Sequence, residues 1–280
     1  MFSPRCCATL TKRGHPQCPL TAYYTVGTHL FCGRHSSAHK EIRRPLPKRI
    51  RAPFDLESQI EHSRTPTLLG SVVLQRFFFR RAVVQQPDRL IVFPNNRHAN
   101  RKDGIGMATL SPMQLGPVHH LQPGFPPALS LENFWQGSKR FAHETEEEFS
   151  AAKRSAFLDP IPHRHKAKGL KPLYWSWVSP VTGEEHRLGV VEARQFYCRF
   201  YQLLVEPLEE YQRLAAMALE HRLTLCGHDA LPISPPTKEG ILAAYRDTSA
   251  SFGHERVLFA MLVLRLNPAG YPWNSEWVAY

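Results

Sequence analysis

Short apolar runs bounded by turn residues mark three strands in this chain. Leu68–Phe79 and Leu90–Phe93 are rich in Val, Ile, Leu and Phe, which fit the extended backbone of a strand. Leu223–Cys226 is a third apolar run, and we predict a buried strand there. Residues 94–128 are rich in Asn, Gly, Pro and His, which predicts a long irregular segment. A loop of that length inside a domain is usually functional or disordered.

Longer segments show apolar residues at intervals of three and four, which predicts helices. These segments are 129–156, where Ser130 can cap the first turn, and then 186–204, 207–221 and 253–265. Helices outnumber strands, and the strands are scattered among them. The pattern therefore predicts an α+β fold in which a small sheet is wrapped by helices.

Composition divides the chain into three parts. Four of the six cysteines lie within residues 1–38, residues 39–66 form a basic, proline-rich linker, and residues 67–280 carry the apolar segments of the α+β domain. No apolar run reaches the length of a membrane span, and the N-terminus lacks an apolar signal region. We therefore expect no membrane partner and a reducing compartment, the cytoplasm or nucleus, in a cell or in association with a virus.

The N-terminal part has the ligand spacing of a small zinc site. The pattern C-x10-C-x13-C-x2-H is formed by Cys7, Cys18, Cys32 and His35. Zinc prefers four such ligands in a tetrahedron, and a segment with almost no core would draw its folding energy from the metal. With Thr-Lys-Arg-Gly at 11–14, the segment resembles a recurrent short Cys3His zinc motif. Cys6 could replace Cys7, and His15 could compete.

Positive charge is concentrated in the same part of the chain. The net charge is +11, and residues 1–51 hold ten Lys and Arg against one acid, Glu41, whereas the other residues hold 25 basic and 23 acidic groups. Such a segment favours nucleic acid or another polyanion as a partner. A solvated basic tail is the alternative, and the zinc knuckle itself could equally be a structural clasp.

Three polar patches beside apolar elements are candidates for a binding site. Glu132, Gln136 and Lys139 are spaced so that one helical face carries all three. Trp175 and Trp177 lie two residues apart, and either ring could stack on a planar base. Asp229 follows the predicted strand at 223–226, a common place for a site residue. Each patch alone also fits a structural role, as an exposed helix, core packing or a turn.

Taken together, the patches resemble the NADAR superfamily over residues 90–266. The matching segments are Ser130–Lys139, Trp175 or Trp177, Arg199–Gln202, Leu225–Asp229 and Phe252–Met261. This chain departs from the family pattern in four places. Glu132–Asn133, with an extra residue before it, replaces a Glu-His pair, and Ala230-Leu-Pro replaces the Trp-Gly that follows the aspartate. The segment between the tryptophan and Asp229 is longer, and residues 110–116 only faintly echo the family's upstream Phe-Ser-Asn-Phe segment.

The resemblance implies an α+β N-glycosidase that acts on ADP-ribose-type or related N-ribosides, a nucleotide-like small molecule. Glu132 and Asp229 would be the catalytic carboxylates, one facing the cationic ribose of the transition state and one acting as acid or base. The implied substrate-binding residues are Asn133, Trp135, Gln136, Lys139, Trp175, Trp177, Arg97 and Arg101. Two other functions compete: a non-catalytic scaffold of the same fold, and a nucleic-acid-binding protein whose large domain only supports the knuckle.

We expect about one zinc ion per chain at Cys7, Cys18, Cys32 and His35, each thiolate at about 2.3 Å from the metal. Elemental analysis of protein purified without added metal measures the stoichiometry. A metal-free chain whose N-terminal segment keeps its structure would contradict the zinc site.

We also expect that removal of residues 1–51 weakens nucleic-acid binding and leaves the large domain folded. Each lost phosphate contact lowers the salt-dependence slope by about one unit. Titrations at several salt concentrations measure this slope. An unchanged affinity and slope in the truncated chain would show that the basic segment does not contact nucleic acid.

Overall fold

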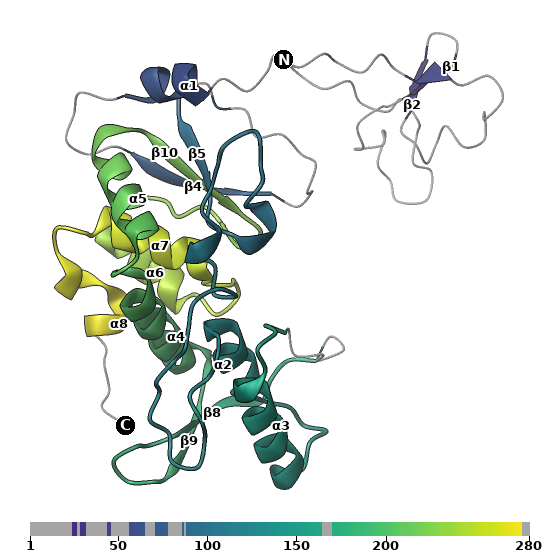
Figure 1. The fold of residues 1–280 in the computed structure, drawn as a ribbon, viewed down its shortest axis with the longest axis vertical. Helices are drawn as coiled ribbons and strands as arrows, with labels where there is room; N and C mark the ends of the chain where they lie inside the picture. The colour runs from purple at the N-terminus through teal and green to yellow at the C-terminus, as the bar shows by residue number, and fades with distance from the viewer. Residues whose placement is uncertain are drawn as a thin grey trace. The chain divides into compact units, whose positions relative to one another are not determined.

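The computed structural model describes residues 24–26, 29–31, 44–45, 56–64, 71–77, 86, 88–163 and 170–275 (Figure 1). The chain divides into two units, Met1–Pro53 and Phe54–Tyr280. In the first unit, β1 (Tyr24–Val26) pairs antiparallel with β2 (His29–Phe31) and with β3 (Arg44–Pro45). The four predicted zinc ligands lie outside the described residues.

The second unit contains two sheets and the helices that pack on them. The first sheet has the order β4 (Val72–Arg76), β10 (Leu223–Gly227), β5 (Leu90–Phe93) and β6 (Ile105–Gly106), with every strand parallel to its neighbours. Residues 90–93 and 223–227 are all buried. Because β10 is inserted between two strands from much earlier in the chain, segments far apart in sequence meet at the carboxyl ends of these strands.

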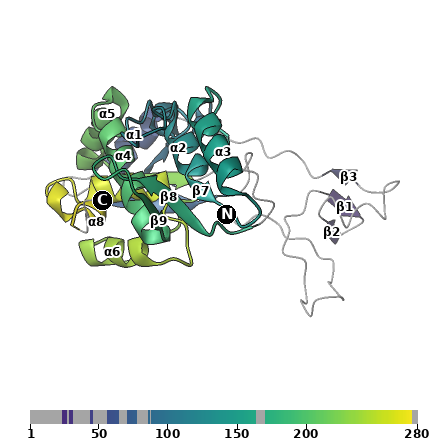
Figure 2. The same ribbon diagram turned by 90° about the horizontal axis from the view of Figure 1, so that it is seen from below.

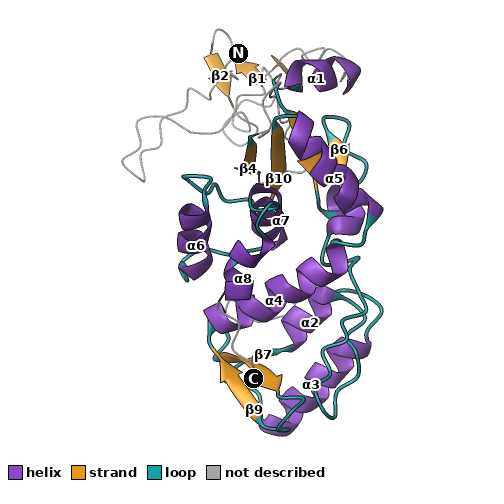
Figure 3. Ribbon diagram, turned by 90° about the vertical axis from the view of Figure 1, so that its left-hand side faces the viewer, coloured by secondary structure: helices purple, strands orange, loops and turns teal. Residues whose placement is uncertain are grey.

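Helix α7 (His254–Val263) packs against β4 and β10 (Figure 3). Nine of its ten residues are buried, so it matches the apolar segment predicted at 253–265. The other longer helices of the unit are α1 (Leu56–Ser63), α2 (Leu131–Gly137), α3 (Glu146–Leu158), α4 (Val190–Val205), α5 (Glu209–Glu220) and α6 (Lys238–Arg246). Short turns of helix form η2 (Asn96–His98), η3 (Ala108–Leu110), η4 (Pro268–Gly270) and α8 (Pro272–Ser275).

A second, antiparallel sheet has the order β7 (Lys139–Arg140), β8 (Tyr174–Val178) and β9 (Glu185–Leu188) (Figure 2). This sheet accounts for two differences between the predicted and the observed elements. The helix predicted over 129–156 is two helices, because 139–140 pairs with β8 and Thr145 then starts α3 through a capping box with Glu148. The helix predicted from 186 begins at Val190, because residues 185–188 pair with β8 instead.

The fold is thus mixed α/β, with a small parallel sheet and surrounding helices, as the coarse prediction had it. Helix α1 lies within the predicted linker but belongs to the second unit. Its Ser63 Oγ lies 3.0 Å from His221 Nδ1, and its Ser63 carbonyl accepts from the Arg222 amide at 3.0 Å. None of the helices in the described part of the chain is long and apolar enough to cross a bilayer.

Lys153 joins α3 to the irregular segment that precedes α2, and His120 makes hydrogen bonds within that segment. Lys153 is fully buried, and its ammonium donates to Gln122 Oε1 at 2.9 Å and to the Ser176 carbonyl at 3.1 Å. Burial lowers the pKa of Lys153 to about 7. His120 accepts from the Gln122 amide through Nδ1 and lies 2.9 Å from the Pro126 carbonyl through Nε2, which suits only a neutral ring.

Burial lowers the pKa of His120 from its ordinary 6.5 to about 4, and the charge of Lys153 acts in the same direction. The unfolded chain therefore binds a proton at this position below about pH 6.5, whereas the folded chain binds it only near pH 4. Stability should fall by roughly 3 kcal/mol between these two pH values on account of His120.

Urea unfolding at a series of pH values measures this loss. In His120→Gln, which keeps a donor and an acceptor but does not titrate, the fall in stability over the same range should be smaller. An equal pH dependence in the two proteins would contradict the assignment.

Candidate functional site

A cavity of about 690 Å³ lies at the carboxyl ends of β4, β10 and β5. Its walls come from η2, the segment after η3, α2, α4 and the start of α7. The lining residues with polar or charged side chains are Asn95, Arg97, His98, Ser111, Glu132, Gln136, Lys139, Arg194, His228, Asp229, Ser251, His254 and Glu255, and Phe77, Trp135, Tyr197 and Phe252 add aromatic rings. The cavity therefore combines charged groups of both signs with aromatic surface.

Helix α2 contributes one wall through the face predicted from its spacing. The Ser130 side chain caps the helix by accepting from the Asn133 amide at 3.1 Å. Gln136 Nε2 donates to Glu132 Oε1 at 2.8 Å, and Lys139 Nζ donates to Gln136 Oε1 at 2.7 Å. Glu132 is 8% exposed and stands in the first turn, at the positive end of the helix dipole. The Gln136 amide thus connects the Glu132 carboxylate to the Lys139 ammonium through two hydrogen bonds.

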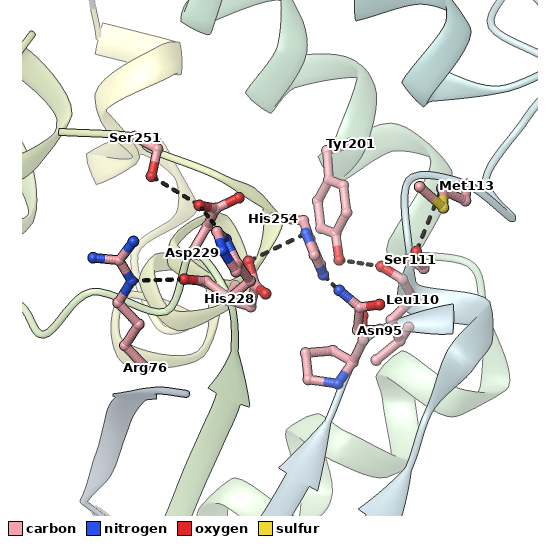
Figure 4. Close-up of polar contacts among 12 residues, drawn as sticks. Arg76, Asn95, Leu110, Ser111, Met113, Tyr201, His228, Asp229, Ser251 and His254 are labelled. Atoms are coloured by element: carbon pink, nitrogen blue, oxygen red, sulfur yellow. Dashed lines mark hydrogen bonds and ion pairs between the residues drawn. The ribbon is translucent and has the colours of Figure 1, made fainter. Parts of the chain in front are cut away.

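Asp229 enters the cavity from the loop after β10. Its Oδ1 accepts from Ser251 Oγ at 3.2 Å and lies 3.3 Å from His228 Nδ1 (Figure 4). The His228 carbonyl in turn accepts from Arg76 Nε at 3.0 Å, so the loop is tied to the end of β4. A serine hydroxyl and an imidazole thus hold one oxygen of the carboxylate.

Two buried arginines hold the loops that carry Asp229 and Ser251. Arg194 donates to the carbonyls of Tyr245 and Asp247 at 2.7 and 2.8 Å and also to that of Ala250. Arg256 donates to the Leu231 carbonyl at 3.1 Å and to the Ser251 carbonyl at 2.9 Å. Burial lowers the pKa of both guanidinium groups from their ordinary value. Their donors are directed at backbone, so they shape the site.

The start of α7 supplies two residues that sequence reasoning did not single out. His254 Nε2 lies 2.9 Å from the Pro94 carbonyl at the end of β5, and Nδ1 lies 3.2 Å from Glu255 Oε2 (Figure 4). Glu255 is only 1% exposed and lies beside Gly227 of β10. The sequence does show a histidine and a glutamate at the start of an almost wholly apolar helix. Burying charged side chains there costs free energy, so this pair could have been singled out as a candidate for the site.

Of the residues predicted for the site, Glu132, Asp229, Trp135, Gln136, Lys139 and Arg97 line the cavity. The structure places the other four elsewhere. Asn133 donates to the carbonyls of Asp159 and Ile161 and accepts from the His163 amide, so it fastens the loop after α3. Arg101 pairs with Asp103 and lies over the ring of Phe93, with its guanidinium carbon 4.8 Å from the ring centroid.

The two predicted tryptophans support the wall from behind. Trp177 is buried in the core, where its ring stacks on Phe196 at a centroid distance of 4.1 Å. Trp175 packs against Trp135 with centroids 5.1 Å apart, and Lys139 Nζ lies 5.2 Å from the Trp135 ring centroid. The aromatic side chain of this group that lines the cavity is therefore Trp135 of α2.

Within the described part of the chain, no cluster of three or more His, Cys, Asp or Glu side chains is arranged to hold a metal. The zinc prediction concerns residues outside that part and stays a prediction.

No family model, curated protein or solved structure matches this chain. The resemblance to the NADAR superfamily rests on the motif residues alone.

Proposed function

We propose that this cavity hydrolyses the N-glycosidic bond of an ADP-ribose-type or related N-riboside, either free or carried on modified nucleic acid. The observation that carries the proposal is the convergence of Glu132 and Asp229, 97 positions apart in sequence, on one cavity that Arg97 and Lys139 also line. The substrate needs a carboxylate for its cationic transition state and cations for its phosphates, and the cavity offers both.

The size and surface of the cavity suit a nucleotide-like ligand. Pockets for small molecules usually have volumes of about 300–1,000 Å³ and combine apolar walls with a few placed polar groups. Arg97 and Lys139 are the groups for phosphate. Trp135 and Phe77 supply aromatic surface for the base, in place of Trp175 and Trp177.

In the proposed mechanism, Glu132 acts as the general base. It takes a proton from a water whose oxygen attacks the anomeric carbon of the ribose. The bond from that carbon to the base nitrogen breaks, and its electron pair stays on the nitrogen. The proton that Glu132 removed from the water passes to the base, or to solvent where the base leaves as a neutral molecule. Asp229, which accepts from Ser251 and lies beside His228, is the second cavity carboxylate and would relay this proton. Gln136 keeps the charges of Glu132 and Lys139 apart.

A binding protein without catalysis is the second candidate. It is favoured by the replacement of the family's Trp-Gly with Ala230-Leu-Pro, where Ala230 is fully buried and the Leu231 carbonyl accepts from Arg256. In that case the cavity would hold a nucleotide, and the basic N-terminal segment would contact nucleic acid. Release of free base from an N-riboside would indicate the hydrolase, whereas binding without release would indicate the binding protein.

We expect Glu132→Gln to lower the rate of base release by about a hundredfold or more, with the fold intact. The amide can still accept from Gln136 Nε2, so the change removes charge and basicity while it keeps shape. The assay offers nicotinamide dinucleotide, ribosylaminopyrimidine phosphates and ADP-ribosylated oligonucleotides, and mass spectrometry quantifies the free base.

Glu147→Gln is the matched control, because Glu147 is also an acid in the first turn of a helix but is exposed and does not line the cavity. Its rate should equal that of the unchanged protein. A fully active Glu132→Gln protein would refute the role of Glu132. No release of base from any of these N-ribosides by the unchanged protein would favour the binding function.

A further inference from the structure

Glu255 is a buried carboxylate whose hydrogen-bonding capacity is unused. Neither of its oxygens has a hydrogen-bond donor in the described part of the chain, although the residue is only 1% exposed and lines the cavity. The His254 imidazole lies beside it, with Nδ1 3.2 Å from Oε2, a contact within ion-pair distance that is not a hydrogen bond. Buried polar groups are normally satisfied, so an exception at a cavity wall points to a missing ligand.

Two glycines leave room for this carboxylate. A Cβ atom at Gly227 would lie 1.9 Å from Glu255 Oε1, so any other residue there would displace the group. A Cβ atom at Gly253 would lie 3.5 Å from both Asp229 Oδ2 and Glu255 Oε2. The two carboxylates therefore border the same small volume at the floor of the cavity.

The electrostatic setting favours a ligand that donates hydrogen bonds. Glu255 stands in the first turn of the ten-residue helix α7, where the dipole stabilises negative charge, and the imidazole of His254 lies beside it. An ionised carboxylate only accepts hydrogen bonds, and its two oxygens can take two donors at once. A phosphate is therefore repelled from this end of the cavity, whereas neighbouring hydroxyl groups fit it.

We propose that Glu255 binds the adjacent 2′- and 3′-hydroxyl groups of the ligand's ribose, and that the site thereby selects ribosides over 2′-deoxyribosides. The inference rests on the proposed function for its ligand class. This assignment orients the ligand, with the sugar hydroxyls at Glu255 and the phosphates toward Arg97 and Lys139. Glu255 is then a specificity residue, distinct from Glu132.

Binding of ADP-ribose and of 2′-deoxy-ADP-ribose to the full chain, measured by calorimetry, tests the assignment. The unchanged protein should bind ADP-ribose about ten- to a hundredfold more tightly than the deoxy compound, the value of a hydrogen bond to a charged group. Glu255→Gln should reduce this ratio to about threefold or less. Gly227→Ala, which displaces the same carboxylate, should reduce it as well, and thermal unfolding checks that both variants fold.

Glu209→Gln is the control, because Glu209 is an exposed acid in the first turn of α5 that does not line the cavity. Its ratio should match that of the unchanged protein. Equal affinity of the unchanged protein for the two compounds, a preserved ratio in Glu255→Gln, or no binding of ADP-ribose would each overturn the assignment. A preference for ADP-ribose that depends on Glu255, without release of base from any N-riboside, would refute the hydrolase and leave this inference standing.

Discussion

The parallel pairing of β10 with both β4 and β5 is the constraint on which the rest of the domain depends. Leu223 stands opposite Val72 on one side and Leu90 on the other, so the three strands run in register and end at one edge of the sheet. The loop of Asp229 and the segment from Pro94 to Arg97 emerge there together. Because α7 packs on the same strands, its polar first turn also reaches that edge.

Placing charge at this edge requires compensation, and the chain supplies it in two ways. The carboxylates of Glu132 and Asp229 accept hydrogen bonds from neighbouring side chains, which offset the loss of hydration. Arg194 and Arg256 instead direct their donors at backbone carbonyls of the surrounding loops. The loops around the cavity are thus held by buried cations. Glu255 is a cavity carboxylate that has no hydrogen-bond donor in the described part of the chain.

Some of the site could be predicted from sequence because it depends on one turn of helix. The spacing of Glu132, Gln136 and Lys139 predicts a shared face, and the structure confirms it through two hydrogen bonds. The Ser130 cap is confirmed for the same reason, since the capping hydroxyl and the Asn133 amide that donates to it are three residues apart. Asn133 differs because a neighbour of Glu132 in sequence points about 100° away around the helix, toward the loop after α3.

The sequence by itself therefore determined the local elements: the apolar strands, the capped start of α2 and the buried course of α7. Only the tertiary structure decided which of the candidate groups meet. Trp177 stacks on Phe196 in the core, Arg101 forms an ion pair with Asp103, and Glu255 lies beside Gly227. The physical reason is the separation of the interacting residues along the sequence. Helical spacing depends on residues within four positions of one another, whereas this cavity is assembled by strand pairing between residues more than a hundred positions apart.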